Sequence, residues 1–501
     1  MRILALVLAG ATLTLGGGAV LGSDADQHGA AAARTDHTNH AAHDAHAVPF
    51  KAGGVITGGG AIASAFVLPG AATTRQLLEG AVHNSEFVDV PGAGGPARAF
   101  VSYPDRADRA PVVIVTTDEG MTDWARALAF QASRDGFIGI VPDSPSPAVE
   151  RFASRIPAAN GAITSLEVGD GRIHAEAGTA PTATFALSDR GWASALEFLS
   201  AQTGNRFDPL PGMDHVAMEM RAGQATGQAG PGTKPRETPG LNVKPDDLPA
   251  NWVMAERIVG TTPRRNEWVD VAVPGTQVRM HTWVVYPEGE QKVGAVLVLH
   301  GASGVTDWVR GVADQLAKDG FIAVVPDLSS GLGPSGGNFD SFRFMDDRMR
   351  ATQALNREAV MGRIKAVRDF AAKMPRSNGR TGSIGFCGGG TNSFTLATDA
   401  PGHNASVVYY GGPPPVASLA KASAPVLGFY GEDDARIFST VAGTRAEMTR
   451  LGKSYESHTY PHATHSFLWM QDLGNNFEAT ADSWPRTIAF YRQHLATPPS
   501  R

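Results

Sequence analysis

The feature that most constrains the fold of this 501-residue chain is an internal repeat. Residues 116–143 and 300–327 align without a gap and are identical at 14 of 28 positions. The similarity extends upstream, where EFVDVPG at Glu86 resembles EWVDVAVPG at Glu267, and VSYP resembles VVYP. Unrelated segments do not share such a string, so we infer that the sequence contains two copies of one folding unit.

Both copies have the pattern of a strand–helix–strand crossover. The apolar runs at residues 111–115 and 295–299 are typical of strands buried in a parallel sheet. In the second copy, an amphipathic helix is expected over residues 307–318, ended by Asp319-Gly320, and the apolar strand FIAVVPD follows. The predicted fold class is therefore α/β, with a mostly parallel sheet flanked by helices.

The two copies differ in length. The second continues through a helix at about 357–374 and a strand at 382–386, and further strand and helix units reach Leu495. The first ends after a helix near 191–201, and we expect it to have no counterpart of the later strands and no catalytic role. Its exposed edge and apolar faces need cover, so we expect it to pack beside the second copy and shape the entrance to its site.

Composition divides the rest of the chain. The apolar run after Arg2 is typical of a secretory signal, and an uncleaved N-terminal anchor is the alternative. After cleavage no stable membrane span is expected, and the protein would be secreted or periplasmic. The predicted organisation is a signal peptide at 1–22, a low-complexity Ala/Gly/His-rich segment at 23–80, the first copy at 83–207, a linker at 208–250 and the catalytic copy at 251–501.

Charge and histidine content limit the partners. Charged residues make up 18% of the chain and the net charge is -6, so no basic surface favours nucleic acid. Histidines cluster in the low-complexity segment, where they could chelate a metal or reflect compositional drift; they are His28, His37, His40, His43 and His46. Their spacing matches no structural metal site, and neither a metal nor another cofactor is expected. The oligomeric state is left open.

Cys387, the only cysteine, lies in the string TGSIGFCGGG. With Gly385 and Gly389 it fits the pattern Gly-x-nucleophile-x-Gly, in which a sharp turn between strand and helix requires small neighbours. The start of the following helix would favour the thiolate. A buried structural cysteine in a Gly-rich turn is the alternative interpretation.

Candidate partners of this nucleophile follow it in the chain. Asp434 comes after an apolar strand in SAPVLGFYGEDDARI, and His462 and His465 end another strand in YPHATHSF. The order nucleophile, acid, base is that of this architecture, although each residue alone could be an ordinary loop residue. The backbone N–H groups of Ala302 and Gly388 are the expected oxyanion donors.

At these motifs the sequence resembles the dienelactone hydrolase family, over roughly residues 267–495. The resemblance rests on VVYP, LVLHGASGV, DGFIAVVPDL, GSIGFCGGG, GFYGEDDARI and YPHATHSF. It implies an α/β-hydrolase fold and hydrolysis of small-molecule esters or lactones, without metal, through an acyl-enzyme on cysteine. The implied triad is Cys387, Asp434 and His465, with His465 preferred to His462.

Two departures from the family pattern bear on the substrate. The position of a glutamate that influences the cysteine is Gly301, and the segment that holds a substrate-binding arginine reads SFLWM, with Trp469 near that place. An ester with an apolar or aromatic acyl group is therefore favoured over dienelactone, with Trp469 as a substrate contact. A non-catalytic binding protein that kept the fold, and an esterase or acyltransferase of other specificity, are the alternatives.

Overall fold

The computed structural model describes residues 68–70, 73–75, 77–78, 84–91, 97–178, 182–206, 244–472 and 475–496. The predicted signal peptide, the histidine cluster, most of the 23–80 segment and most of the 208–250 linker lie outside these residues. The chain divides into two units, Met1–Thr57 and Gly58–Arg501, and the fold described below belongs to the second.

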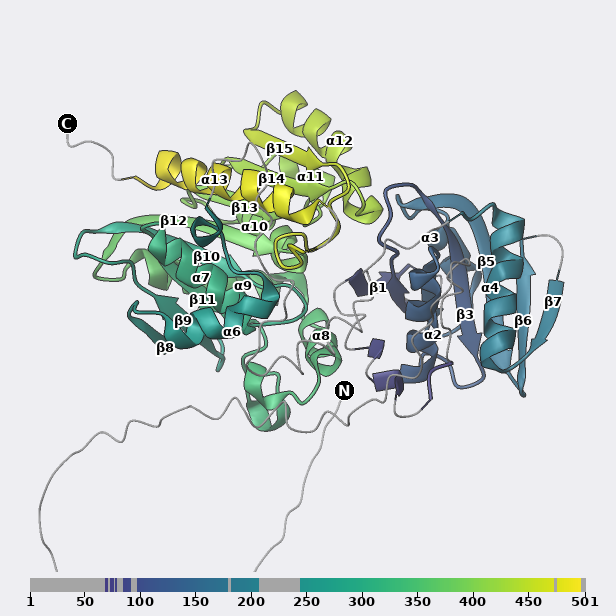
Figure 1. Cartoon of the computed structure of the whole chain (residues 1–501). Coiled ribbons are helices and arrows are strands. Elements are labelled where there is room, and N and C mark those ends of the chain that lie inside the picture. Colours follow the sequence, from purple (N-terminus) through teal and green to yellow (C-terminus); the bar gives the residue numbers. More distant parts are fainter. Residues whose placement is uncertain are drawn as a thin grey trace, which may run out of the picture. The chain divides into compact units, whose positions relative to one another are not determined.

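The first copy forms a seven-stranded sheet in the order β1-β2-β4-β3-β5-β6-β7. Side chains alternate along β3, so that Val113 and Val115 face one core and Val112 and Ile114 face another. The first core is covered by α2 and α4, and the second by α3 (Figure 1). The elements are β1 (Ser85–Val90), β2 (Ala97–Ser102), β3 (Ala110–Thr117), α2 (Asp123–Arg134), β4 (Ile138–Pro142), α3 (Pro147–Ala153), β5 (Ala159–Gly169), β6 (Arg172–Ala177), β7 (Thr182–Ala186) and α4 (Asp189–Thr203).

The expectation that the first copy lacks every later strand is wrong for one strand. β5 pairs in parallel with β3, as β12 (Ser377–Phe386) pairs with β10 (Val293–Leu299) in the second copy. Both pairs contain the same irregularity, in which two residues on one strand face four on the other. After β5 the copies diverge, because Asp170 and Gly171, both at positive φ, turn the chain into the antiparallel strand β6.

The second copy forms an eight-stranded sheet in the order β15-β14-β13-β12-β10-β11-β9-β8. The strands from β10 to β15 run parallel to one another, and β9 pairs antiparallel with both β11 and the edge strand β8. The remaining elements are α6 (Trp252–Thr261), β8 (Asn266–Ala272), β9 (Arg279–Val285), α7 (Asp307–Lys318), β11 (Ile322–Pro326), α8 (Met345–Gln353), α9 (Arg357–Ala372), α10 (Gly388–Asp399), β13 (Ala405–Tyr409), α11 (Val416–Leu419), β14 (Val426–Gly431), α12 (Ala435–Arg450), β15 (Tyr455–Tyr460) and α13 (Asn476–Leu495). This is the α/β arrangement that the sequence predicts.

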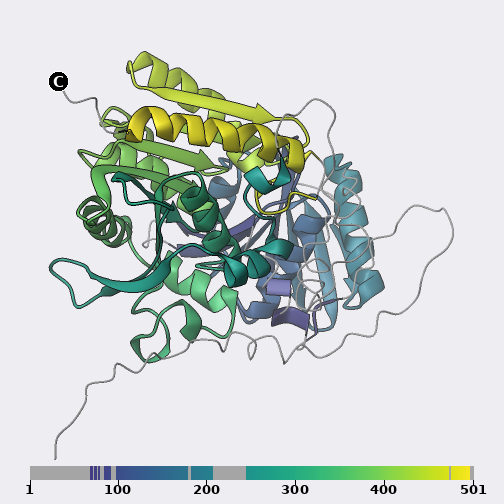
Figure 2. The same ribbon diagram turned by 60° about the vertical axis from the view of Figure 1, so that its left-hand side comes forward.

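Helices cover both faces of this sheet. Val296 and Val298 of β10 pack in one core with α6, α7 and α13, whereas its residues Ala295, Leu297 and Leu299 pack in the other with α9. On the same face as α9, the helices α10 and α12 cover β13 and β14. Figure 2 shows the long yellow helix α13 lying across green strands of the sheet.

Local sequence explains the helix that both copies share. Thr122 and Thr306 precede an Asp-Trp pair, and each threonine side chain accepts a hydrogen bond from the N–H three residues on. Such a cap satisfies one of the free donors at a helix start. The helix predicted over 307–318 is confirmed as α7, and that over 357–374 as α9, which ends at Ala372.

Described residues at the end of the 23–80 segment pack against the first copy. Leu77 and Leu78 are buried in the core under α2, and the indole of Trp124 donates to the carbonyl of Pro69 at 2.7 Å. Leucines at these two positions have apolar surface to bury.

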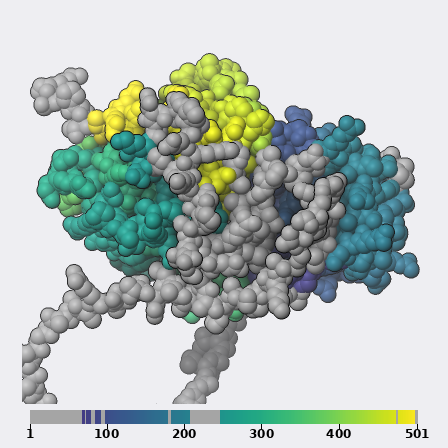
Figure 3. All heavy atoms as spheres, viewed as in Figure 1, coloured from purple at the N-terminus to yellow at the C-terminus, as the bar shows by residue number. Residues whose placement is uncertain are grey.

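The two copies contact each other through polar side chains. Arg126 of α2 forms an ion pair with Asp346 of α8 at 2.6 Å, and both side chains are almost fully buried. The Phe87 N–H donates to the side chain of Gln353 at 2.8 Å. In the space-filling view, the yellow and yellow-green C-terminal segments of the second copy lie together (Figure 3). Among the described helices, none combines the length and apolarity needed to cross a bilayer.

Candidate active site

Cys387 occupies a sharp turn between β12 and α10. Its backbone has φ 54° and ψ -122°, in a region that side-chain-bearing residues rarely adopt. Such a conformation costs about 1–3 kcal/mol and persists only where the surroundings impose it. Here the Cys387 N–H donates to the carbonyl of Tyr409 at 3.1 Å, and its own carbonyl accepts from Thr391. The turn presents the thiol above the carboxyl ends of the strands.

Two glycines make this turn possible. A Cβ atom on Gly385 would lie 1.9 Å from the carbonyl oxygen of Gly389, and one on Gly389 would lie 2.0 Å from that of Leu299. Neither backbone neighbour can move without breaking the sheet or the helix. The Gly-x-Cys-x-Gly pattern is therefore a packing requirement of the turn.

Asp434 and His465 meet at the same end of the sheet. Asp434 follows β14 and caps α12, and His465 lies in the loop after β15. His465 Nδ1 lies 2.6 Å from Asp434 Oδ2, and each residue is only 1% exposed. His462 instead lies at the exposed start of the loop with φ 58°. The structure thus pairs Asp434 with the histidine preferred from the sequence.

The charges around Cys387 favour a thiolate. Burial alone would raise the pKa of the thiol, but His465, Arg436 and the Gly388 N–H outweigh burial and lower it to about 7. Burial alone would lower the pKa of His465, but Asp434 and Cys387 raise it to about 10. A thiolate beside an imidazolium is the pairing that activates a cysteine nucleophile.

The Nε2 atom of His465 faces away from Asp434. Within the described part of the chain, His465 Nε2 is buried and has no hydrogen-bond partner that meets ordinary geometry. The nitrogen is therefore available to the thiol or to a leaving group. Among the described residues, no group of three or more His, Cys, Asp or Glu side chains could hold a metal ion.

The loop after β10 faces the nucleophile, and His300 fixes its course. The Leu328 N–H donates to His300 Nε2 at 3.1 Å, and His300 Nδ1 lies 2.7 Å from the carbonyl of Gly301, so that Nδ1 carries the proton. Burial lowers the pKa of His300, which keeps this neutral tautomer. The loop places Gly301 and Ala302 beside Cys387, where Ala302 was expected to supply an oxyanion donor.

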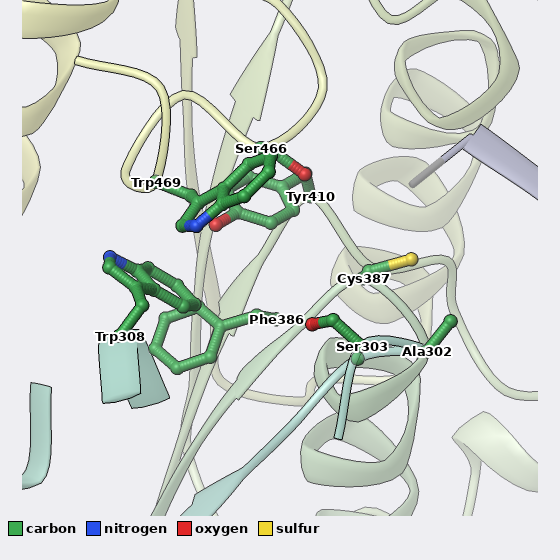
Figure 4. A pocket seen from close by; sticks show the side chains of 9 residues that line it. Ala302, Ser303, Trp308, Phe386, Cys387, Tyr410, Ser466 and Trp469 are labelled. Atoms are coloured by element: carbon green, nitrogen blue, oxygen red, sulfur yellow. The ribbon is translucent and has the colours of Figure 1, made fainter. Parts of the chain in front are cut away.

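A pocket that is partly open to solvent lies against Cys387. Four aromatic rings group on one side of the cysteine, and Ala302 and Ser303 lie below it (Figure 4). Apart from Cys387, the lining consists of uncharged residues: Gly301, Ala302, Ser303, Trp308, Phe386, Tyr410, Ser466 and Trp469. Trp469, the substrate contact predicted from the sequence, is among them and packs on Trp252 of α6 at 5.7 Å.

Two polar atoms of the pocket wall have no partner among the described residues. They are the Tyr410 hydroxyl and the Trp308 indole nitrogen, both buried. Burial raises the pKa of Tyr410 well above its usual value, so the hydroxyl remains a donor. Tyr410 directly follows β13 at φ 41°. Neither residue was predicted from the sequence, because no local motif marks a side chain that joins the pocket wall only through the tertiary fold.

A sequence model of the dienelactone hydrolase family matches residues 280–495, which include the turn, the acid and the base. Residues 280–495 belong to the dienelactone hydrolase family. This dienelactone hydrolase domain has the α/β-hydrolase fold, and the chain is a hydrolase of the ester- and lactone-cleaving class.

Curated relatives match the same domain. A Saccharolobus solfataricus protein, provisionally named a carboxymethylenebutenolidase, is 25% identical over 229 residues, which are 40% of this chain and 89% of the relative. A Bradyrhizobium protein, provisionally named a 2-oxo-3-(5-oxofuran-2-ylidene)propanoate lactonase, is 29% identical over 46% of this chain and 94% of that protein. A solved structure from Klebsiella pneumoniae, provisionally named a dienelactone hydrolase, is 24% identical with a TM-score of 0.41, and the similarity covers 46% of this chain and all of that one.

Gly301, the position at which the sequence is expected to depart from the family pattern, lies against the nucleophile. A Cβ atom there would lie 3.2 Å from the Cβ of Cys387, so any side chain at position 301 would press against the nucleophile. Glycine leaves that side of the cysteine open to the pocket. The charged groups that act on the thiolate come from other elements.

Proposed function

We propose that the chain hydrolyses carboxylic esters or lactones through an acyl-enzyme on Cys387, with His465 as general base and acid and Asp434 as its orienting carboxylate. The 2.6 Å contact between Asp434 and His465, on the loops that flank the cysteine turn, carries this proposal. A buried, paired imidazole beside a strained cysteine has no structural purpose that an apolar core would not serve better.

The reaction balances in two halves. The Cys387 thiolate attacks the acyl carbon, and the oxygen of the tetrahedral adduct takes the negative charge opposite the N–H groups of Ala302 and Gly388. His465 gives its proton to the departing alkoxide, which leaves as the alcohol and yields a thioester. Water, losing a proton to His465, then attacks the thioester and releases the acid and the thiolate. In a lactone the alcohol stays attached to the acyl group.

The pocket supports a neutral aromatic or apolar acyl group as the substrate. Its wall offers four rings and no charged side chain, so a carboxylate placed there would lose its hydration without gaining a counter-ion. The rings of Tyr410 and Trp308, which line the pocket, can pack against an apolar or aromatic acyl group. This selects against a dienelactone carboxylate, in line with the loss of the family's arginine near Trp469.

The decisive experiment uses the single cysteine. Cys387→Ala should remove turnover of p-nitrophenyl esters while circular dichroism and thermal unfolding stay as in the wild type. With the wild-type protein, mass spectrometry of a quenched reaction should find the acyl group on the peptide that contains Cys387. Turnover by folded Cys387→Ala, or an acyl group on another residue, would refute the assignment.

A matched pair of histidine variants tests the base. His465→Ala should lose acylation, whereas His462→Ala, three residues earlier in the same loop and not paired with Asp434, should keep it. Equal losses in the two variants would mean that the loop, and not the imidazole of His465, supports the reaction.

A further inference from the structure

The first copy meets the second at the loop that carries the catalytic acid. Arg106 of the first copy and Asp434 form an isolated parallel β-bridge, and the Ala435 N–H donates to the carbonyl of Arg106 at 3.0 Å. The Arg106 side chain is buried within its own copy, where it donates to the carbonyl of Gly136 at 2.9 Å and to Asn205 at 2.7 Å. The backbone next to Asp434 is therefore hydrogen-bonded to a residue whose side chain is fixed within the first copy.

Arg436, two residues after the acid, is held by side chains of the first copy. Its guanidinium lies 3.6 Å from the carboxylate of Glu86 and 4.9 Å from the ring centre of Tyr103. The Tyr103 hydroxyl donates to the same Glu86 carboxylate at 2.8 Å. Glu86 and Tyr103 thus form a clamp, with a charge on one side of the guanidinium and an aromatic face on the other.

The clamped arginine lies next to the candidate triad in the fold: it is in the first turn of α12, which Asp434 caps, and Asp434 lies 2.6 Å from His465. Burial alone would lower the pKa of Arg436, but Glu86, Asp434 and Cys387 raise it, so the side chain stays charged. Arg436 is in turn one of the groups that lower the pKa of Cys387, after His465. Tyr410 also interacts with the thiol, and it remains neutral. The pocket wall itself supplies no positive charge.

The geometry points to a role for the truncated copy within the active site: through Glu86 and Tyr103 it positions Arg436, and Arg436 stabilises the thiolate of Cys387. Arg436 and its two holders are positioning residues, because none of them lines the substrate pocket. This inference rests on the proposed role of Cys387 as nucleophile.

A long arginine side chain loses rotamer freedom when it is fixed, and that cost is met by the contacts that hold it. Without the clamp, Arg436 would spread over several rotamers, and its mean charge near the thiolate would fall. The clamp residues come from a copy that has no counterpart of Cys387. This gives the duplicated unit a function that does not require it to be catalytic.

Alkylation by iodoacetamide across pH measures the thiol without using any ester. Arg436→Gln should raise the apparent pKa of Cys387 by about one unit, and Arg436→Lys, which keeps the charge, should raise it less. Glu86→Gln removes a negative charge, and if Arg436 stayed in place this would lower the thiol pKa. We expect the pKa to rise instead, because the clamp releases the arginine. The double variant should match Arg436→Gln alone.

Gln353→Ala provides the control. It removes the neighbouring contact between the copies, to the Phe87 N–H, without changing a charge, and it should leave the thiol pKa unchanged. An unchanged pKa in Arg436→Gln, or a lowered one in Glu86→Gln, would overturn the inference while leaving the nucleophile assignment intact. An ordinary thiol pKa in the wild type would instead count against the proposed function itself.

Discussion

Asp434 and His465 share a hydrogen bond of 2.6 Å between Oδ2 and Nδ1, although 31 residues separate them in the chain. The contact is sealed from solvent, since each residue is 1% exposed. It fixes the imidazole so that Nε2 carries no competing interaction within the described residues. The order of β14 and β15 in the sheet brings the two loops together, and the variants below test what that contact does.

Asp434→Asn should lower kcat for ester hydrolysis by about 10³–10⁴-fold, because the amide no longer stabilises the imidazolium or its tautomer. The neighbouring carboxylate provides a matched control: Asp433→Asn alters the same loop without touching His465 and should retain the wild-type kcat. Steady-state kinetics on one p-nitrophenyl ester measure both. A comparable loss in Asp433→Asn would mean that loop structure, and not the carboxylate of Asp434, matters.

The pH dependence of alkylation should show an acidic thiol. With a folded pKa of about 7, below the value of about 8.5 for a free thiol, roughly half of Cys387 is thiolate at neutral pH. The alkylation rate should therefore rise about tenfold per pH unit below 7 and level off above it. The same measurement in denaturant should level off only above about pH 8.5. Coincident profiles in the folded and denatured protein would contradict the structure's electrostatics.

The uncharged pocket predicts discrimination between substrates. An aryl ester should have a kcat/KM at least about tenfold above that of the same ester with a carboxylate on its acyl group, because the wall offers that charge no partner. Trp469→Ala should raise KM for the aryl ester more than it lowers kcat, since the ring contacts the acyl group and not the reacting atoms. Preference for the carboxylated ester would refute this view of the pocket.

The glycines of the cysteine turn should differ sharply in their tolerance of a methyl group. Gly389→Ala places a Cβ atom 2.0 Å from the carbonyl oxygen of Leu299 and should lower the free energy of unfolding by about 3 kcal/mol. Gly388→Ala meets nothing within 4 Å and should change it by less than about 1 kcal/mol. Urea unfolding of both variants tests the prediction, and similar values for the two would show that the turn is less tightly packed than described.

Much of the fold follows from local sequence. The apolar run of β10 and the Thr-Asp-Trp start of α7 each determine an element within a few residues. The chain order of Cys387, Asp434 and His465 was sufficient to identify a candidate triad, because parallel strands end at one edge of their sheet.

The features that could not be predicted from the sequence depend on contacts between distant segments. Arg436 lies on an ordinary helix, and only the docking of the first copy against the acid loop surrounds it with Glu86 and Tyr103. Glu86 was visible as part of the repeated string, but a repeat indicates homology and not contact. β5 was missed because its sequence, ANGAITSLEVG, begins with turn residues and has no long apolar run.

The irregular pairing that β3 shares with β5, and β10 with β12, bears on the history of the chain. A slip of two residues has no reason to arise twice at the same place, so the ancestor that duplicated already possessed it. The two copies differ immediately beyond this strand pair. In the second copy, β12 turns sharply into the helix α10, whereas in the first copy β5 turns into a hairpin with β6. The two copies therefore share their descent as far as this strand pair, and they differ from the point at which the second copy places Cys387.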